Sequence, residues 1–120
     1  MTERPHYRLE AWRESMDLVK RLYKWSAQFP VDERYGLIMQ IRRAAVSVPS
    51  NIAEGAARDG SREFARFLGI ARGSLSELET QYLLAVELGF AAPDQELLAT
   101  IEKTSRLLTG LHKKHSAQRT

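Results

Sequence analysis

The sequence predicts an all-α protein, an antiparallel up-down-up-down four-helix bundle. Four segments carry apolar residues at spacings of three and four, which places them on one face of a helix. Short segments with Gly, Pro and Asp separate them, so consecutive helices are expected to pack as antiparallel neighbours. No segment combines alternating apolar residues with the chemistry of a hairpin turn. We expect a single domain over residues 1–120, with helices at about residues 9–28, 32–58, 61–88 and 93–116.

The first helix is expected to end before Pro30, because proline cannot continue a helix. Its apolar face is predicted to be Trp12, Met16, Val19 and Tyr23, widened by Leu18, Leu22 and Trp25. Asp32 is well placed to cap the second helix, since its carboxylate can accept hydrogen bonds from free backbone N–H groups. The core positions of the second helix are predicted to be Ile38, Ile41, Ala45, Val48 and Ile52.

Pro49 lies inside the second predicted helix. Proline has no backbone N–H, so a carbonyl group of the preceding turn loses its partner, and the helix is expected to bend without ending. The polar side chains of Ser47, Ser50 and Asn51 can hydrogen-bond the freed backbone groups. A second interpretation makes Asn51 and Glu54 part of a binding site at the bend.

The third helix is bounded by glycines. Gly60 is expected to end the second helix, Ser61 to cap the third, and Gly89 to end it. The predicted core positions of the third helix are Phe64, Leu68, Ala71, Leu75, Leu78, Tyr82 and Ala85. Pro93 suits the first turn of the fourth helix. The predicted core positions of the fourth helix are Leu97, Ile101, Thr104, Leu108 and Leu111.

The apolar stripes are wider than the core of one bundle requires, which is about three positions in seven. The additional positions are Phe67, Ile70, Leu83, Leu84, Leu98 and Leu107. A second apolar surface of this kind usually marks an association site. The sequence therefore predicts self-association, and the alternative is a thick core with some exposed leucines.

Charge is unevenly distributed along the chain, whose net charge is +3. Residues 1–73 hold 13 Lys/Arg and 9 Asp/Glu, and residues 74–102 hold 6 Asp/Glu and no Lys/Arg. Residues 103–120 hold 5 Lys/Arg and no Asp/Glu. In an up-down bundle, this order makes one end basic and the other acidic. A basic end attracts phosphate backbones without reading base sequence.

The predicted nucleic-acid-binding residues are cations of the basic end and of the second helix. They are Arg58, Arg62, Arg66, Lys113, Lys114, Arg42 and Arg43, and Arg119 extends the same end. Arginine, which makes two-pronged contacts with phosphate, accounts for 13 of the 18 basic residues. The alternative is that these side chains pair with nearby acids and only solvate the surface.

The sequence offers little support for a catalytic, metal or cofactor site. The Glu-x-x-His spacing of di-iron bundles occurs only at Glu3–His6, in a proline-containing segment. His112 and His115 lack further ligands, and a phosphate-binding glycine loop is absent. The one enzymatic alternative pairs Arg106 with His112, at the loose Arg-x(4–6)-His spacing of HEPN-type helical ribonucleases. We therefore expect a non-enzymatic protein without metal or cofactor.

A cytoplasmic location is expected from three features. The chain contains no cysteine, and its N-terminal segment lacks the apolar run of a signal peptide. Its longest apolar stretches are far shorter than a membrane span, so no membrane partner is expected.

Three segments resemble the intervening-sequence proteins, a family of small bacterial four-helix bundle proteins, some of them encoded within genes for 23S ribosomal RNA. The segments are LEAWRESMDLV at 9–19, YGLIMQIRRAAVSVPSNIAEG at 35–55 and SREFARFLGIARGSLSELETQ at 61–81. The resemblance implies a homopentamer. It also implies kinship with the accessory protein of diversity-generating retroelements, which binds nucleic acid and a reverse transcriptase. A scaffold that binds RNA or DNA is therefore expected, and a protein-interaction scaffold is the alternative.

Overall fold

A computed structural model of the chain describes residues 3–117, and within these residues all regular structure is helical. The long helices are α1 (Glu10–Ser26), α2 (Leu37–Ala56), α3 (Ser61–Glu87) and α4 (Gln95–Ser116). Two short 3-10 helices, Pro5–Arg8 and Val31–Glu33, precede α1 and α2.

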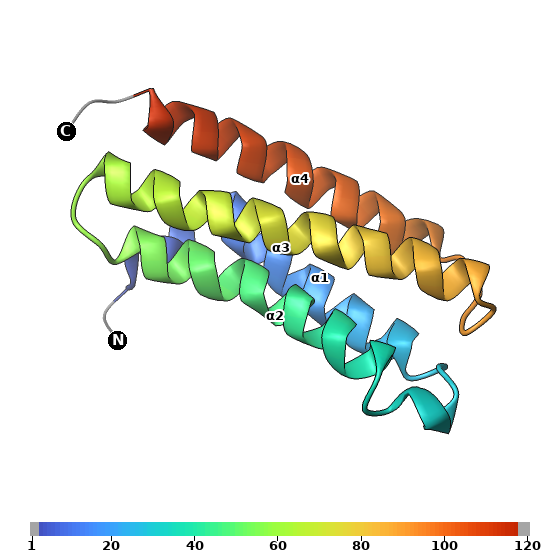
Figure 1. Cartoon of the computed structure of the whole chain (residues 1–120). Coiled ribbons are helices and arrows are strands. Elements are labelled where there is room, and N and C mark those ends of the chain that lie inside the picture. The colour runs from blue at the N-terminus through green and yellow to red at the C-terminus, as the bar shows by residue number, and fades with distance from the viewer. Residues whose placement is uncertain (1–2, 118–120) are drawn as a thin grey trace.

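The four helices form an antiparallel bundle, in which each packs against the next and α1 also packs against α4 (Figure 1). Two hydrogen bonds join segments far apart in the chain. The indole N–H of Trp25, near the end of α1, donates to the carbonyl of Ala92 before α4, at 2.8 Å. At the other end, the Ser61 hydroxyl at the start of α3 lies 2.9 Å from Nδ1 of His115 in the last turn of α4. The predicted fold class is confirmed.

The core positions predicted for α2, α3 and α4 are also confirmed. All of them are buried except Ile38, Phe64 and Leu111, which are half-buried and pack against the core. Thr104 is fully buried among apolar residues because its hydroxyl donates to the carbonyl of Thr100 at 2.7 Å.

The apolar face predicted for α1 is confirmed at Leu18, Leu22 and Trp25, which are buried, and wrong in its central stripe. Met16 and Tyr23 are 37% and 40% exposed, and Trp12 and Val19 are only half-buried. The buried face also includes Ala11, Ser15 and Ser26, which were not predicted. Ser15 hides this face in the sequence, because its polar side chain interrupts the apolar pattern. Its hydroxyl donates to the Trp12 carbonyl at 2.8 Å, which allows a serine to be buried.

The second helix begins at Leu37 and not near residue 32, so Asp32 is not its N-cap. Asp32 lies in a 3-10 turn, and the role predicted for it falls to Glu33. The Glu33 carboxylate accepts a hydrogen bond from the backbone N–H of Leu37 at 3.1 Å. The sequence offered two acids in succession, and the turn places only the second within reach of the helix.

Other helix ends differ from the predictions by one or two residues. Ser61 is the first residue of α3 and not its cap, which is Gly60 with φ of 84°. Pro93 lies outside α4, whose cap is Asp94, accepting from the N–H of Leu97 at 3.0 Å. Gly89 does end α3: its φ of 77° is a left-handed conformation that favours glycine.

Helix α2 continues through Pro49, as predicted, and Pro49 itself is buried. The amide of Asn51 donates to the carbonyl and the hydroxyl of Ser47 at 2.8 and 2.9 Å. Glu54 pairs with Arg58 at 2.9 Å. Asn51 and Glu54 are thus engaged within the chain, which favours the structural interpretation of this segment over a binding site.

Helices α2 and α3 are in close contact at Gly55. A Cβ atom on Gly55 would lie 2.6 Å from Cβ of Phe67 and 3.0 Å from Cδ1 of Phe64. No other residue type leaves room for the two phenylalanines at this crossing. The end of α2 is thereby held against the start of α3, where the predicted basic residues lie.

Candidate nucleic-acid interface

Five predicted cations lie at one end of the bundle, which we call the basic end. They are Arg58, Arg62, Arg66, Lys113 and Lys114. Arg58 follows α2, the next two lie in the first two turns of α3, and the lysines lie in the last turn of α4. The contact between Ser61 and His115 brings the start of α3 to the end of α4. Arg119, predicted at the same end, lies outside the described residues.

Arg58 and Arg66 both lie against the ring of Phe67. Their guanidinium carbons lie 5.2 and 4.5 Å from the ring centroid of Phe67, at cation–π distance. Arg58 also pairs with Glu54 at 2.9 Å, and Arg66 pairs with Glu63 at 3.1 Å. The hydrogen bond from Arg66 lowers the pKa of Glu63, so this carboxylate stays charged. Both arginines are thus fixed in position and partly neutralised.

Arg62, Lys113 and Lys114 are exposed, and none of them has an ion pair within residues 3–117. A free cation contributes its full charge to the surface potential, whereas a paired one is largely cancelled at a distance. These three residues therefore carry the positive field of the basic end.

Arg42 and Arg43 do not lie at the basic end. Arg42 precedes Ala56, the last residue of α2, by fourteen positions, which is about 21 Å along a helix. Its guanidinium donates to the Ser26 hydroxyl at 2.8 Å and to the Tyr23 carbonyl at 3.1 Å, and it lies 4.4 Å from the Tyr23 ring centroid. Arg42 therefore joins α2 to the last turn of α1. Its neighbour Arg43 is exposed at the same level of the bundle.

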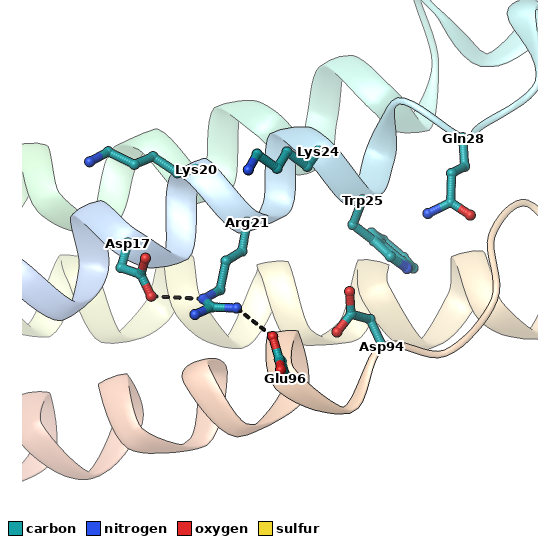
Figure 2. Close-up of a pocket in the computed structure, with 8 residues that line it drawn as sticks. All are labelled: Asp17, Lys20, Arg21, Lys24, Trp25, Gln28, Asp94 and Glu96. Atoms are coloured by element: carbon teal, nitrogen blue, oxygen red, sulfur yellow. Dashed lines mark hydrogen bonds and ion pairs between the residues drawn. The ribbon is translucent and has the colours of Figure 1, made fainter.

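The opposite end carries acids and cations together, and not acids alone. Arg21 lies between Asp17 of α1 and Glu96 of α4, at 2.8 and 2.9 Å (Figure 2). These hydrogen bonds, first that to Asp17, raise the pKa of Arg21. Lys20 and Lys24 line the same hollow. The mixed charge of this end could not be predicted from the sequence, because the basic second half of α1 meets the acidic start of α4 only in the folded chain.

The residues of the enzymatic alternative face different neighbours. Arg106 lines a shallow groove with Leu9 and Ala11 on the α1 side of α4. Nδ1 of His112 instead lies 3.3 Å from Nη1 of Arg72 on α3. Arg106 and His112 thus have different partners, on the α1 side and on the α3 side of α4.

His112 and His115 lie three residues apart near the end of α4. Residues 3–117 contain no group of three or more side chains suited to hold a metal ion. The His115 ring packs against Phe64 at a centroid distance of 4.5 Å. Burial, and secondly the charge of Lys114, lowers the pKa of His115.

Two apolar surfaces remain exposed on the described chain. The α1–α2 surface consists of the exposed Met16, Tyr23 and Val46, with the half-buried Trp12 and Val19 and the buried Pro49 beside them. These residues line two hollows that share Val46. The α3 surface consists of Leu84 and Leu88 at the end of the helix, and Ile70 is exposed about 21 Å earlier along α3. The sequence predicted the exposed positions Ile70, Leu83 and Leu84, whereas Phe67 is buried and Leu98 and Leu107 are half-buried. The α1–α2 surface was not predicted, because the sequence pattern placed that face of α1 in the core.

None of the helices within residues 3–117 has both the length and the apolar character needed to cross a membrane. The family model for 23S rRNA-intervening sequence proteins matches residues 7–110 of the chain. No curated protein matches the chain.

Proposed function

Because the chain belongs to the 23S rRNA-intervening sequence protein family, we propose that it is a non-enzymatic scaffold whose basic end binds the phosphate backbone of RNA or DNA. The observation that supports this most directly is the set of free cations Arg62, Lys113 and Lys114. Arg58 and Arg66, held against Phe67, add guanidinium groups whose positions are fixed before a ligand arrives. A cytoplasmic location goes with this proposal, since cellular RNA is found there.

Recognition in this proposal depends on charge and shape. The cations point from helix ends and not from an element suited to enter a groove and read base edges. Contacts to phosphate fix position and carry no sequence information. We therefore expect binding that tolerates many sequences.

The salt dependence of binding tests this function. Fluorescence anisotropy with labelled single- and double-stranded RNA and DNA is expected to show affinity falling steeply from about 25 to 300 mM salt, because each neutralised phosphate releases counterions. The slope of log affinity against log salt should be about −0.7 to −0.9 for each phosphate contacted. Absence of salt-dependent binding to all four ligands would exclude the proposal. The α1–α2 surface would then favour the alternative, a scaffold for a protein partner.

The proposed assembly is a homo-oligomer, and the family resemblance makes a pentamer the expected form. A closed ring joins two different surfaces of the same chain, and the α1–α2 and α3 surfaces are two such apolar patches. A ring would also gather several basic ends and strengthen their field.

Light scattering is expected to give a mass about five times the 13.7 kDa of one chain. Val46→Glu on the α1–α2 surface and Leu84→Glu on the α3 surface should each lower this mass, since both put a charge into an apolar contact. Val31→Glu is the matched control, because Val31 is 75% exposed in the loop before α2. A wild-type monomer at micromolar concentration would contradict the assembly.

A further inference from the structure

Arg72 of α3 and His112 of α4 form a contact between two groups that can both carry positive charge. Nη1 of Arg72 lies 3.3 Å from Nδ1 of His112. A guanidinium N–H only donates, so Nδ1 must accept, which requires a neutral imidazole with its proton on Nε2. Protonation of Nδ1 would remove this acceptor and place two cations side by side.

No carboxylate balances this pair in the described structure. Neither residue has an ion pair, and the acids nearest along the two helices are Glu77, Glu79 and Glu102. Glu79 is seven residues from Arg72 and Glu102 is ten from His112, or about 10 and 15 Å along the helices. Glu77 projects from another side of α3, since five residues turn a helix by about 140°.

The other charged groups near His112 are cationic. On α4 itself, Lys113 is the next residue and His115 lies one turn further, bonded to Ser61. On α3, which packs against this face, Arg72 is the charged residue that contacts His112. The site is therefore positive in both states of the imidazole and more so when it is protonated.

The surface beside the pair is open to the α3 backbone. Gly69 and Gly73 flank Arg72, and both are exposed. A Cβ atom on Gly73 would have no neighbour within 4 Å, and one on Gly69 would meet only Nε2 of His112, at 3.8 Å. Glycine inside a helix costs about 0.5–1 kcal/mol relative to alanine, and packing within the chain does not require it here. The two glycines keep side chains away from the guanidinium and the imidazole.

We propose that Arg72 and His112 form a phosphate-binding subsite that extends the basic end along the face shared by α3 and α4. A phosphodiester group there accepts from the guanidinium and from the protonated imidazole, and so separates and neutralises the two cations. Lys113, the residue after His112, connects the subsite with the basic end. This inference rests on the proposed function, and it adds that binding strengthens as pH falls.

Binding of one single-stranded RNA oligonucleotide at pH 6.0 and pH 8.0, at constant ionic strength, tests the subsite. Histidine is the side chain that usually changes charge in this range. We expect wild type to bind about two- to fivefold more tightly at pH 6.0, the size of an exposed charge interaction. His112→Gln should abolish this difference and keep the affinity at pH 8.0, whereas Arg72→Gln should weaken binding at both pH values.

Arg106→Gln is the matched control, because it removes an exposed guanidinium from the side of α4 that faces α1. It should leave the ratio between the two pH values unchanged. Circular dichroism of each variant checks that the helices are retained. In parallel, the imidazole resonances are followed by NMR as inorganic pyrophosphate is added, with His6 as the internal reference. The His112 resonances are expected to move and those of His6 to stay in place.

The outcomes distinguish failure of the subsite from failure of the proposed function. If the oligonucleotide binds with the same pH ratio in wild type and His112→Gln, the subsite is wrong and the proposed function stands. If pyrophosphate moves the His112 resonances but no nucleic acid binds, the subsite takes a free phosphate compound and the proposed function is wrong. If neither ligand has an effect, both are wrong.

Discussion

Gly55→Ala is expected to lower the free energy of unfolding by about 1–3 kcal/mol, the usual cost of overpacking a core. The new Cβ would lie 2.6 Å from Cβ of Phe67, which is fixed to the α3 backbone and cannot move away by a change of rotamer. The same substitution inside an unobstructed helix stabilises by about 1 kcal/mol. The sign of the effect therefore reports whether α2 and α3 meet at this residue. Urea denaturation followed by circular dichroism gives the measurement.

Gly73→Ala is the control for this experiment. Gly73 lies in the interior of α3, and a Cβ atom there would meet nothing within 4 Å. Its replacement is expected to raise the free energy of unfolding by about 0.5–1 kcal/mol. A Gly55→Ala protein as stable as wild type would show that the helices do not cross at Gly55.

The double substitution Arg62→Glu and Lys113→Glu is expected to cause the largest loss of nucleic-acid affinity. Both side chains are exposed and free of ion pairs within residues 3–117, so the folded chain should tolerate the change. Each lost phosphate contact lowers the salt slope by about one. We expect a slope reduced by about two for each subunit engaged, and affinity at low salt reduced at least about tenfold. Anisotropy titrations at several salt concentrations measure both quantities.

Lys20→Glu with Lys24→Glu provides the matched control. This pair changes the net charge by the same amount. Both lysines are exposed on the second half of α1, which lies at the end of the bundle opposite to the basic end (Figure 2). If binding depends on the basic end, the control should retain most of its affinity and its slope. Equal losses in the two double variants would mean that only the net charge of the protein matters.

Three helices could be predicted closely from sequence because their buried positions are occupied almost entirely by apolar residues. In α1 the predicted stripe was displaced toward Met16 and Tyr23, because the buried face includes Ser15, whose burial depends on a hydrogen bond to a backbone carbonyl that no periodicity reveals. The start of α2 failed for a related reason. Asp32 and Glu33 are both suitable caps, and only the geometry of the preceding turn selects the second.

The part of the candidate site that follows from the order of the helices could be predicted from the sequence. An up-down order places the start of α3 beside the end of α4, which brings Arg62 near Lys113. What sequence could not supply was the partner of each cation. Arg42 is engaged by Tyr23 and Ser26, sixteen or more residues earlier, and this pairing exists only once α1 and α2 have packed. The contact of Arg72 with His112, forty residues apart, was missed for the same reason.

The closure of the bundle between α1 and α4 has a consequence for how the chain folds. Among the four long helices, the other contacts join helices that follow one another in sequence, and such local topologies fold fast. The α1–α4 contact closes the longest loop, and its ion pairs, Lys103 with Glu10 and Glu14 and Arg21 with Glu96, are largely exposed and individually weak. We expect α2 and α3 to supply the folding nucleus and the α1–α4 contact to form after the transition state. Weakening that contact would then leave the folding rate nearly unchanged and speed unfolding.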